Sequence, residues 1–253
     1  MNWQGEAIIL GVRKHGETSA IIDVFSFDRG RHSGLVRGGI SRKLRPVLQP
    51  GNTVLLEWRA RMEDHLGYFT VEPVDMRAAQ LLDDPLSLCG LNAACAIARE
   101  VLPERQPLPH LYQAFGVLLD NLHDPQIWPA IFVRLELGLL EALGYGLDLK
   151  TCAASGRNDQ LAYVSPKTGR AVSEAAGEPY KDRLFKLPTF ILGEPVISPG
   201  DIHEGLRMTG YFLETRVLHD FNRPLPEARA RMLDRLVASG FAEPRQSEES
   251  IET

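Results

Sequence analysis

The stretch WPAIFVRLELGLLEALGYG, residues 128–146, is the longest apolar run in the chain. Apolar side chains recur through it at helical spacing and cover most of its circumference, and only Arg134, Glu136 and Glu141 are charged. A helix that is apolar on nearly every side packs inside a domain, whereas three internal charges are atypical of a membrane span. We therefore expect a core helix, capped at or near Asp124 and ended by Gly144 and Gly146.

The sequence before this helix has β character. Val54, Leu56 and Trp58 alternate with polar or charged neighbours, so one face of their strand is expected to be buried. No segment is long enough for the helical crossover of a parallel sheet. Five strands predict a small antiparallel barrel, most economically a five-stranded OB-fold. The expected strands are residues 4–13, 19–27, 32–37, 52–61 and 68–74.

Helical periodicity begins near residue 78, so the fold class is predicted to be α+β. The first helical run is interrupted at Asp84-Pro85, where a second helix is expected to start. Residues 148–188 lose the period and contain a short strand and turn at 163–169. Further helices are expected at 111–122, 199–221 and 224–239. The predicted parts are a barrel at 1–77, helical segments at 78–147 and 191–240, an insert at 148–190 and a disordered tail at 241–253.

Charge is distributed unevenly along the chain. The formal net charge is −5, yet residues 1–61 hold ten Lys or Arg against five Asp or Glu. Between Arg29 and Arg61 eight basic residues accompany one acidic residue, Glu57. This pattern indicates a basic module on an acidic body. A solvated basic surface without a ligand is the plainer alternative.

Cysteine usage and the N-terminus favour a cytoplasmic protein. Cys89, Cys95 and Cys152 are an odd number without framework spacing, which is typical of a reducing compartment. The sequence MNWQGEAIIL has neither the basic region nor the cleavable apolar core of a signal peptide.

Signals for an enzyme are weak. Gly38-Gly39 lacks the third glycine and the following helix of a phosphate-binding loop. The adjacent pairs His123-Asp124 and His219-Asp220 suggest a metal-dependent phosphohydrolase, but both stand next to helix ends, where capping explains them more simply. We therefore expect no catalytic residue, no bound metal and no cofactor.

The basic residues of the barrel are the strongest functional signal. OB barrels bind single strands through a basic groove with aromatic stacking platforms. His32, Trp58, Tyr68 and Phe69 share these strands, although Trp58 is expected in the core because it alternates in phase with Val54 and Leu56. A protein-interaction scaffold that binds an acidic partner is the alternative. The expected phosphate contacts are Arg31, Arg37, Arg42, Lys43, Arg45, Arg59 and Arg61.

Four motifs in order resemble one family across nearly the whole chain. They are GRHSGLVRGGISRK (30–43), LELGLLEALGYGLDLKTC (135–152), YVSPKTGRAVS (163–173) and RPLPEARARML (223–233). Together they are similar to RecO, the bacterial recombination mediator family. The resemblance implies an OB domain that binds single- and double-stranded DNA, strand annealing, and contact with single-strand-binding protein. It also implies cooperation with RecR in loading RecA, with nucleoid association during repair.

The insert departs from the pattern of zinc-bearing relatives. They carry two CxxC pairs, whereas this chain has Cys152-Ala153-Ala154-Ser155 and Ser173-Glu174-Ala175-Ala176. No histidine lies between residues 124 and 202 to substitute. Because a structural zinc ion needs four nitrogen or sulfur ligands, the insert is predicted to be a metal-free, degenerate zinc-ribbon-like module. Its small core is expected to contain Leu161, Tyr163, Val164, Val172 and Leu184.

Overall fold

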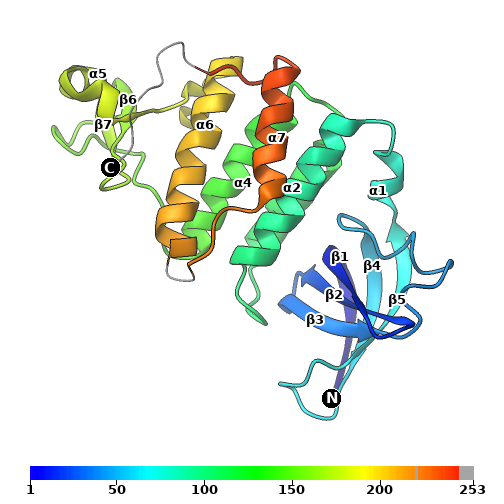
Figure 1. Cartoon of the computed structure of the whole chain (residues 1–253). Helices are drawn as coiled ribbons and strands as arrows, with labels where there is room; N and C mark the ends of the chain where they lie inside the picture. The colour runs from blue at the N-terminus through cyan, green and yellow to red at the C-terminus, as the bar shows by residue number, and fades with distance from the viewer. Residues whose placement is uncertain (220–221, 245–253) are drawn as a thin grey trace. The chain divides into compact units, whose positions relative to one another are not determined.

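The computed structural model describes residues 1–219 and 222–244 (Figure 1). Contacts divide the chain into two compact units, Met1–Asp124 with Pro226–Arg229, and Pro125–Leu225 with Ala230–Thr253. The fold is α+β, with a five-stranded N-terminal sheet and helices, as the sequence predicts. Asp220 and Phe221, at the end of the helix predicted at 199–221, lie outside the described residues. So do residues 245–253 of the predicted tail. No described helix combines the length and apolar character needed to cross a bilayer.

The first unit begins with five strands that close on themselves. Their hydrogen-bonded order is β1-β2-β3-β5-β4, and β4 pairs in turn with β1. Only β3 and β5 run parallel; every other neighbouring pair is antiparallel. All five strands that the sequence predicts are therefore present. Their bounds are β1 (Asn2–His15), β2 (Ser19–Ser26), β3 (Gly30–Val36), β4 (Thr53–Arg59) and β5 (Tyr68–Asp75).

Alternation along the strands fills the interior of this sheet. Val54, Leu56 and Trp58 are buried, as their spacing predicts. Gly34 on β3 leaves room for the Phe69 ring, which a Cβ at that position would strike. Glycine is also needed at position 30, where the turn between β2 and β3 ends. Gly30 adopts a positive φ of 64°, and a Cβ there would strike the backbone of Gln106.

Three helices complete the first unit: α1 (Arg77–Gln80), α2 (Pro85–Val101) and α3 (Pro109–Asn121). Helix α2 starts at Asp84-Pro85 as predicted, and the Asp84 carboxylate caps it by accepting from the backbone N–H groups of Leu86 and Ser87. Helix α2 packs on β1. Arg99 of α2 pairs with the buried Asp23 of β2 at 3.0 Å, which ties the helix to the sheet.

In the second unit, α4 (Trp128–Ala142) is the predicted core helix. Trp128, Phe132 and Leu140 are fully buried, and Gly144 ends the helix with a φ of 85°. The expected cap at Asp124 is wrong: α4 begins after Ile127 without a side-chain cap. Asp124 is separated from α4 by a turn at residues 125–127. In addition, Pro129 in the first helical turn has no N–H group that a cap could bind.

Helix α4 packs against α6 (Pro199–Phe212), and the buried Glu136 accepts a hydrogen bond from Thr209 of α6. The helix continues as a π-helical turn, Leu213–Leu218, and α7 spans Glu227–Ala238. The capping box at Ser198 and Asp201 explains where α6 starts.

The insert contains more regular structure than a strand and a turn. Strands β6 (Leu161–Val164), β7 (Ala171–Ser173) and β8 (Phe185–Lys186) form a sheet in the order β7-β6-β8. Short helical turns flank this sheet: α5 (Glu174–Gly177), η1 (Glu178–Arg183) and η2 (Thr189–Leu192). The predicted small core is only partly correct. Val164 is fully buried, but the accompanying buried residues are Ala171 and Phe185. Leu161, Tyr163, Val172 and Leu184 are only partly buried.

Candidate nucleic-acid interface

An open groove with a volume of about 640 Å³ lies on the first unit, beside β3 and β5. Arg37, which follows β3, lines it together with Lys43 from the next loop and Arg59 at the end of β4. Tyr68 and Thr70 of β5 also line this groove. We call the surface formed by Arg37, Lys43, Arg59 and Tyr68 the β3–β5 groove.

Tyr68 is the exposed aromatic side chain of this groove. It is 47% exposed, whereas the next residue, Phe69, is 4% exposed and points into the core. The parallel pairing of β3 with β5 places Leu35 opposite Tyr68, which brings Arg37 near the ring. The Arg37 guanidinium lies 4.5 Å from the Tyr68 ring centroid, a cation–π geometry. An exposed ring beside a guanidinium offers a stacking face next to a positive charge.

The structure brings some of the seven predicted contact residues together and leaves others apart. Arg37, Lys43 and Arg59 line the β3–β5 groove. Arg61 lines a neighbouring pocket of about 320 Å³ with His15 and His65, and Tyr68 belongs to both hollows. Arg42 and Arg45 are exposed on the loop that supplies Lys43, but they do not line the groove.

Arg31 is held elsewhere in the first unit. Its Nε donates to the carbonyl of Leu102 at 2.7 Å, and its guanidinium pairs with Glu104 at 3.3 Å. The side chain is only 17% exposed. These contacts connect β3 to the end of α2, so Arg31 has a structural role in this geometry.

The sequence suggests basic residues without acidic partners, and for Arg31 and Arg59 that expectation is wrong. Arg59 donates twice to Glu57 Oε1, from Nε at 2.8 Å and from Nη2 at 2.7 Å. Glu57 is the single acidic residue of the basic run, and it lies two residues earlier on the same face of β4. An exposed pair of this kind is weak, so the guanidinium remains able to exchange Glu57 for another anion.

The other predicted aromatic residues form a core cluster. His32 lies 5.0 Å from the Trp58 ring centroid and 5.9 Å from that of Phe69. Trp58 donates its indole N–H to the Leu66 carbonyl, so its expected core position is confirmed. Burial lowers the pKa of His32 below its ordinary value. The neutral imidazole therefore belongs to the packed interior.

Three of the four ligand-like positions of the insert lie close together. Cys152 Sγ accepts from the Ser173 backbone N–H at 3.2 Å and lies 3.4 Å from Ser173 Oγ. Hydrogen bonds with the side chains of Ser155 and Ser173 lower the pKa of Cys152 to about 6, against the opposing effect of burial. Within residues 1–219 and 222–244, no group of three or more His, Cys, Asp or Glu is arranged to hold a metal ion.

The His-Asp pairs do not build a second site in the described chain. His123 and Asp124 lie in the turn after α3, and Asp124 does not cap α4. His219 follows the π-helical turn, and its neighbour Asp220 lies outside the described residues.

A closed five-stranded sheet with a basic, aromatic groove is typical of proteins that bind the backbone of nucleic acids. Comparison with known proteins narrows this class to a family. The family model described as recombination protein O N terminal matches residues 1–77, and recombination protein O C terminal matches residues 82–224. The chain belongs to this family.

Curated relatives cover almost the same length. The protein named DNA repair protein RecO from Phenylobacterium zucineum (strain HLK1) is 51% identical over 241 residues, which cover 95% of this chain and 99% of the relative. The protein of the same name from Ruegeria sp. (strain TM1040) is 52% identical over 237 residues, 93% and 98% of the two chains. That from Caulobacter sp. (strain K31) is 48% identical over 241 residues, 95% and 99% of the two chains.

Proposed function

We propose that this protein is a DNA-binding mediator of recombinational repair and that its β3–β5 groove holds the phosphate backbone of a single strand. The observation that carries the proposal is the convergence of Arg37, Lys43 and Arg59 around the exposed Tyr68. Backbone neutralisation and base stacking together bind single strands with little sequence preference. Membership of a family whose relatives are named DNA repair proteins supports the same role.

We further propose that the five strands form an OB-type barrel within residues 1–77. Support comes from the closed order β1-β2-β3-β5-β4 with its single parallel pair. The proposed DNA surface extends from the β3–β5 groove to Arg61 on the loop before β5, and to Arg42 and Arg45 on the loop before β4. Loops at one end of such a barrel commonly contribute to oligonucleotide binding. We also propose that the rest of the chain is divided into helical segments at 78–147 and 191–240, an insert at 148–190 and a tail at 241–253.

Annealing follows from charge neutralisation. Two phosphate backbones repel each other, and a basic surface that holds one or both lowers the cost of their approach. This role needs no reactive side chain, so we propose that the protein is not an enzyme. We also propose that it acts in the cytoplasm and at the nucleoid. There it would anneal complementary strands and, with RecR, help RecA replace single-strand-binding protein on DNA.

The insert is proposed to be a zinc-ribbon-like module in which hydrogen bonds occupy the place of a metal. The support is local: Cys152 and Ser173 are in contact, and Ser155 interacts with the same sulfur. The serine hydroxyls and the Ala176 methyl group are poor or impossible zinc ligands.

Binding of mixed-sequence single-stranded DNA tests whether the β3–β5 groove is the DNA-binding site. Arg37→Ala with Lys43→Ala should weaken binding at least about tenfold at fixed low salt, because two phosphate contacts are lost. The matched variant Lys150→Ala with Lys167→Ala removes the same charge from exposed positions of the second unit and should change affinity much less. Fluorescence anisotropy with a labelled oligonucleotide measures both affinities.

The same titration addresses the competing role as a protein scaffold. If an acidic polypeptide such as polyglutamate binds tightly while the oligonucleotide does not bind, the groove serves an acidic protein partner and the DNA proposal fails. Equal losses in the two double variants would instead show that only net charge matters and that the groove is misplaced.

A further inference from the structure

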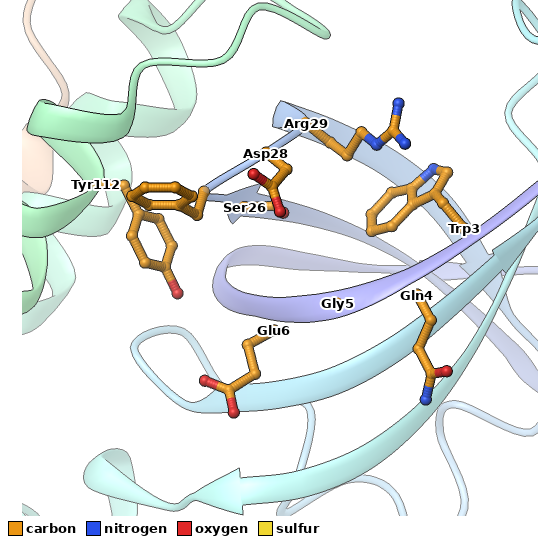
Figure 2. A pocket seen from close by; sticks show the side chains of 9 residues that line it. Trp3, Gln4, Gly5, Glu6, Ser26, Asp28, Arg29 and Tyr112 are labelled. Carbon is orange, nitrogen blue, oxygen red and sulfur yellow. The ribbon is translucent and has the colours of Figure 1, made fainter.

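A second cleft on the first unit has the opposite chemistry to the β3–β5 groove. It has a volume of about 640 Å³ and is lined by the start of β1, the turn between β2 and β3, and Tyr112 of α3. Figure 2 shows Trp3 and Arg29 toward one end and Tyr112 toward the other, with Glu6 and Asp28 contributed by different segments. We call it the β1 cleft.

Two carboxylates, those of Glu6 and Asp28, line the β1 cleft. Glu6 and Asp28 are exposed, and neither forms an ion pair with any residue that the structure describes. Arg29 is the one basic residue among those that line the cleft, so the lining carries two negative charges against one positive charge. Such a lining repels phosphate and attracts an ammonium or guanidinium group.

Aromatic rings supply the remaining walls. Phe27 is 39% exposed, and its ring lies 5.9 Å from that of Tyr112 in a nearly perpendicular arrangement. The Glu6 charge also helps to raise the pKa of Tyr112, after the larger effect of burial. At the other end, the Arg29 guanidinium lies 5.9 Å from the Trp3 ring centroid. The cleft thus already accommodates one guanidinium against an aromatic ring.

The backbone beside this cleft is an open strand edge. The Met1 carbonyl accepts from the N–H of Ala60, and the Met1 ammonium donates to the Ala60 carbonyl. Because antiparallel hydrogen-bonded pairs alternate, Trp3 and Gly5 direct their backbone groups toward β4. The backbone groups of Gln4 and Glu6 then face the opposite side.

No described strand covers that side of Gln4 and Glu6. Pairing between β1 and β2 begins only at Ala7 and Ser26, beyond this part of β1. An extended chain can therefore pair with the edge and place its side chains in the β1 cleft. Gly5 leaves room for it, because a Cβ at this position would meet nothing within 4 Å.

We propose that the β1 cleft docks an extended segment of a partner protein, and that a lysine or arginine of this segment lies between Glu6, Asp28 and the aromatic walls. The proposal is independent of DNA binding, because it uses a different, acidic surface. A partner segment bound here leaves the residues of the β3–β5 groove available.

The tryptophan indole N–H signals of the full-length protein provide a direct test by ¹H–¹⁵N NMR. The probe is the blocked hexapeptide Thr-Val-Arg-Val-Lys-Thr, and its control has glutamate in place of arginine and lysine. The basic peptide should shift the Trp3 signal saturably and leave that of the fully buried Trp128 in place, while the acidic peptide should shift neither. The Trp3→Phe variant assigns the signal.

Two sets of variants locate the binding. Glu6→Gln with Asp28→Asn should weaken peptide binding at least about tenfold, whereas Glu17→Gln with Glu72→Gln, at exposed positions outside the cleft, should have little effect. Gly5→Leu should fill the cleft and abolish peptide binding while the melting temperature stays unchanged. If that variant unfolds, the test rests on Glu6→Gln with Asp28→Asn alone.

The proposal would be overturned by the absence of a Trp3 shift at millimolar peptide, by equal peptide binding in the two double variants, or by an equal Trp3 shift from spermidine alone. The last would mean that the cleft binds a small free cation instead of a polypeptide. A stronger Trp3 shift with an oligonucleotide than with the basic peptide would also contradict it.

Discussion

Tyr68 and Phe69 are neighbours with opposite environments. Alternation along β5 turns Phe69 into the core and leaves Tyr68 on the surface, beside Arg37. The sequence indicates that aromatic residues accompany the basic ones, but it does not show which ring is exposed. The signal that could have identified Tyr68 is its alternation with Phe69 and Val71, both of which are buried.

Arg31 and Arg59 show why charge density alone does not define the site. Arg59 pairs within its own strand, whereas Arg31 contacts Leu102 and Glu104, far along the chain. Sequence reasoning had no means to find this long-range contact. Arg37 and Lys43, in contrast, are exposed on either side of Gly38-Gly39, so the structure leaves these two predicted contact residues accessible.

His32 should make the first unit less stable in mild acid. Its folded-state pKa is lowered chiefly by burial, so below about pH 6.5 the unfolded chain binds a proton that the folded chain excludes. The free energy of unfolding should therefore fall as pH decreases through that range. The variant His32→Gln should reduce this dependence, as measured by denaturant unfolding between pH 7 and pH 5.

If His32→Gln and the parent lose stability equally on acidification, His32 is not the group responsible.

Among the elements, the strands and the start of α2 are predictable because their signals are local. Alternation marks β4, and Asp84-Pro85 combines an N-cap residue with a proline at the first helical position. The start of α4 was not predictable in the same way, because packing determines where that uncapped helix begins. The core of the insert was only partly identified, since the pairing of β8 with β6 joins distant residues.

The cap on α2 should contribute measurably to stability. Asp84 accepts from Leu86 and Ser87, and Ser87 Oγ also donates to the Leu122 carbonyl. Asp84→Ala should lower the free energy of unfolding by about 1 kcal/mol, whereas Asp84→Asn should retain most of the cap. Denaturant unfolding at neutral pH measures the difference. Equal losses in the two variants would show that charge, and not the hydrogen-bonded cap, is responsible.

The insert should keep its stability without zinc. Chelator should leave the melting temperature unchanged, because Cys152 supplies the one thiolate among the ligand-like positions and already interacts with Ser155 and Ser173. Cys152→Ser should cost no more than an ordinary small substitution. Calorimetry and elemental analysis of untagged protein provide the measurements. Stoichiometric zinc that survives dialysis against chelator would contradict this account.

For the whole molecule, the uneven charge distribution is the signal that places the predicted DNA-binding surface on the N-terminal strands. It did not reveal that α1, α2 and α3 belong to the same compact unit as those strands. It also did not reveal the β1 cleft, because Glu6 and Asp28 are minor exceptions within a basic segment and meet only after β1 and the β2–β3 turn come together.

The salt dependence of single-strand binding tests the central claim most directly. For the parent protein, the logarithm of the association constant should fall linearly with the logarithm of salt concentration. Arg37→Ala with Lys43→Ala should make that slope shallower by about 1.4, or about 0.7 for each lost phosphate contact, while Arg31→Ala should leave it unchanged. A flat response in the parent, or the same slope in the parent and the double variant, would contradict the proposal that the β3–β5 groove binds DNA.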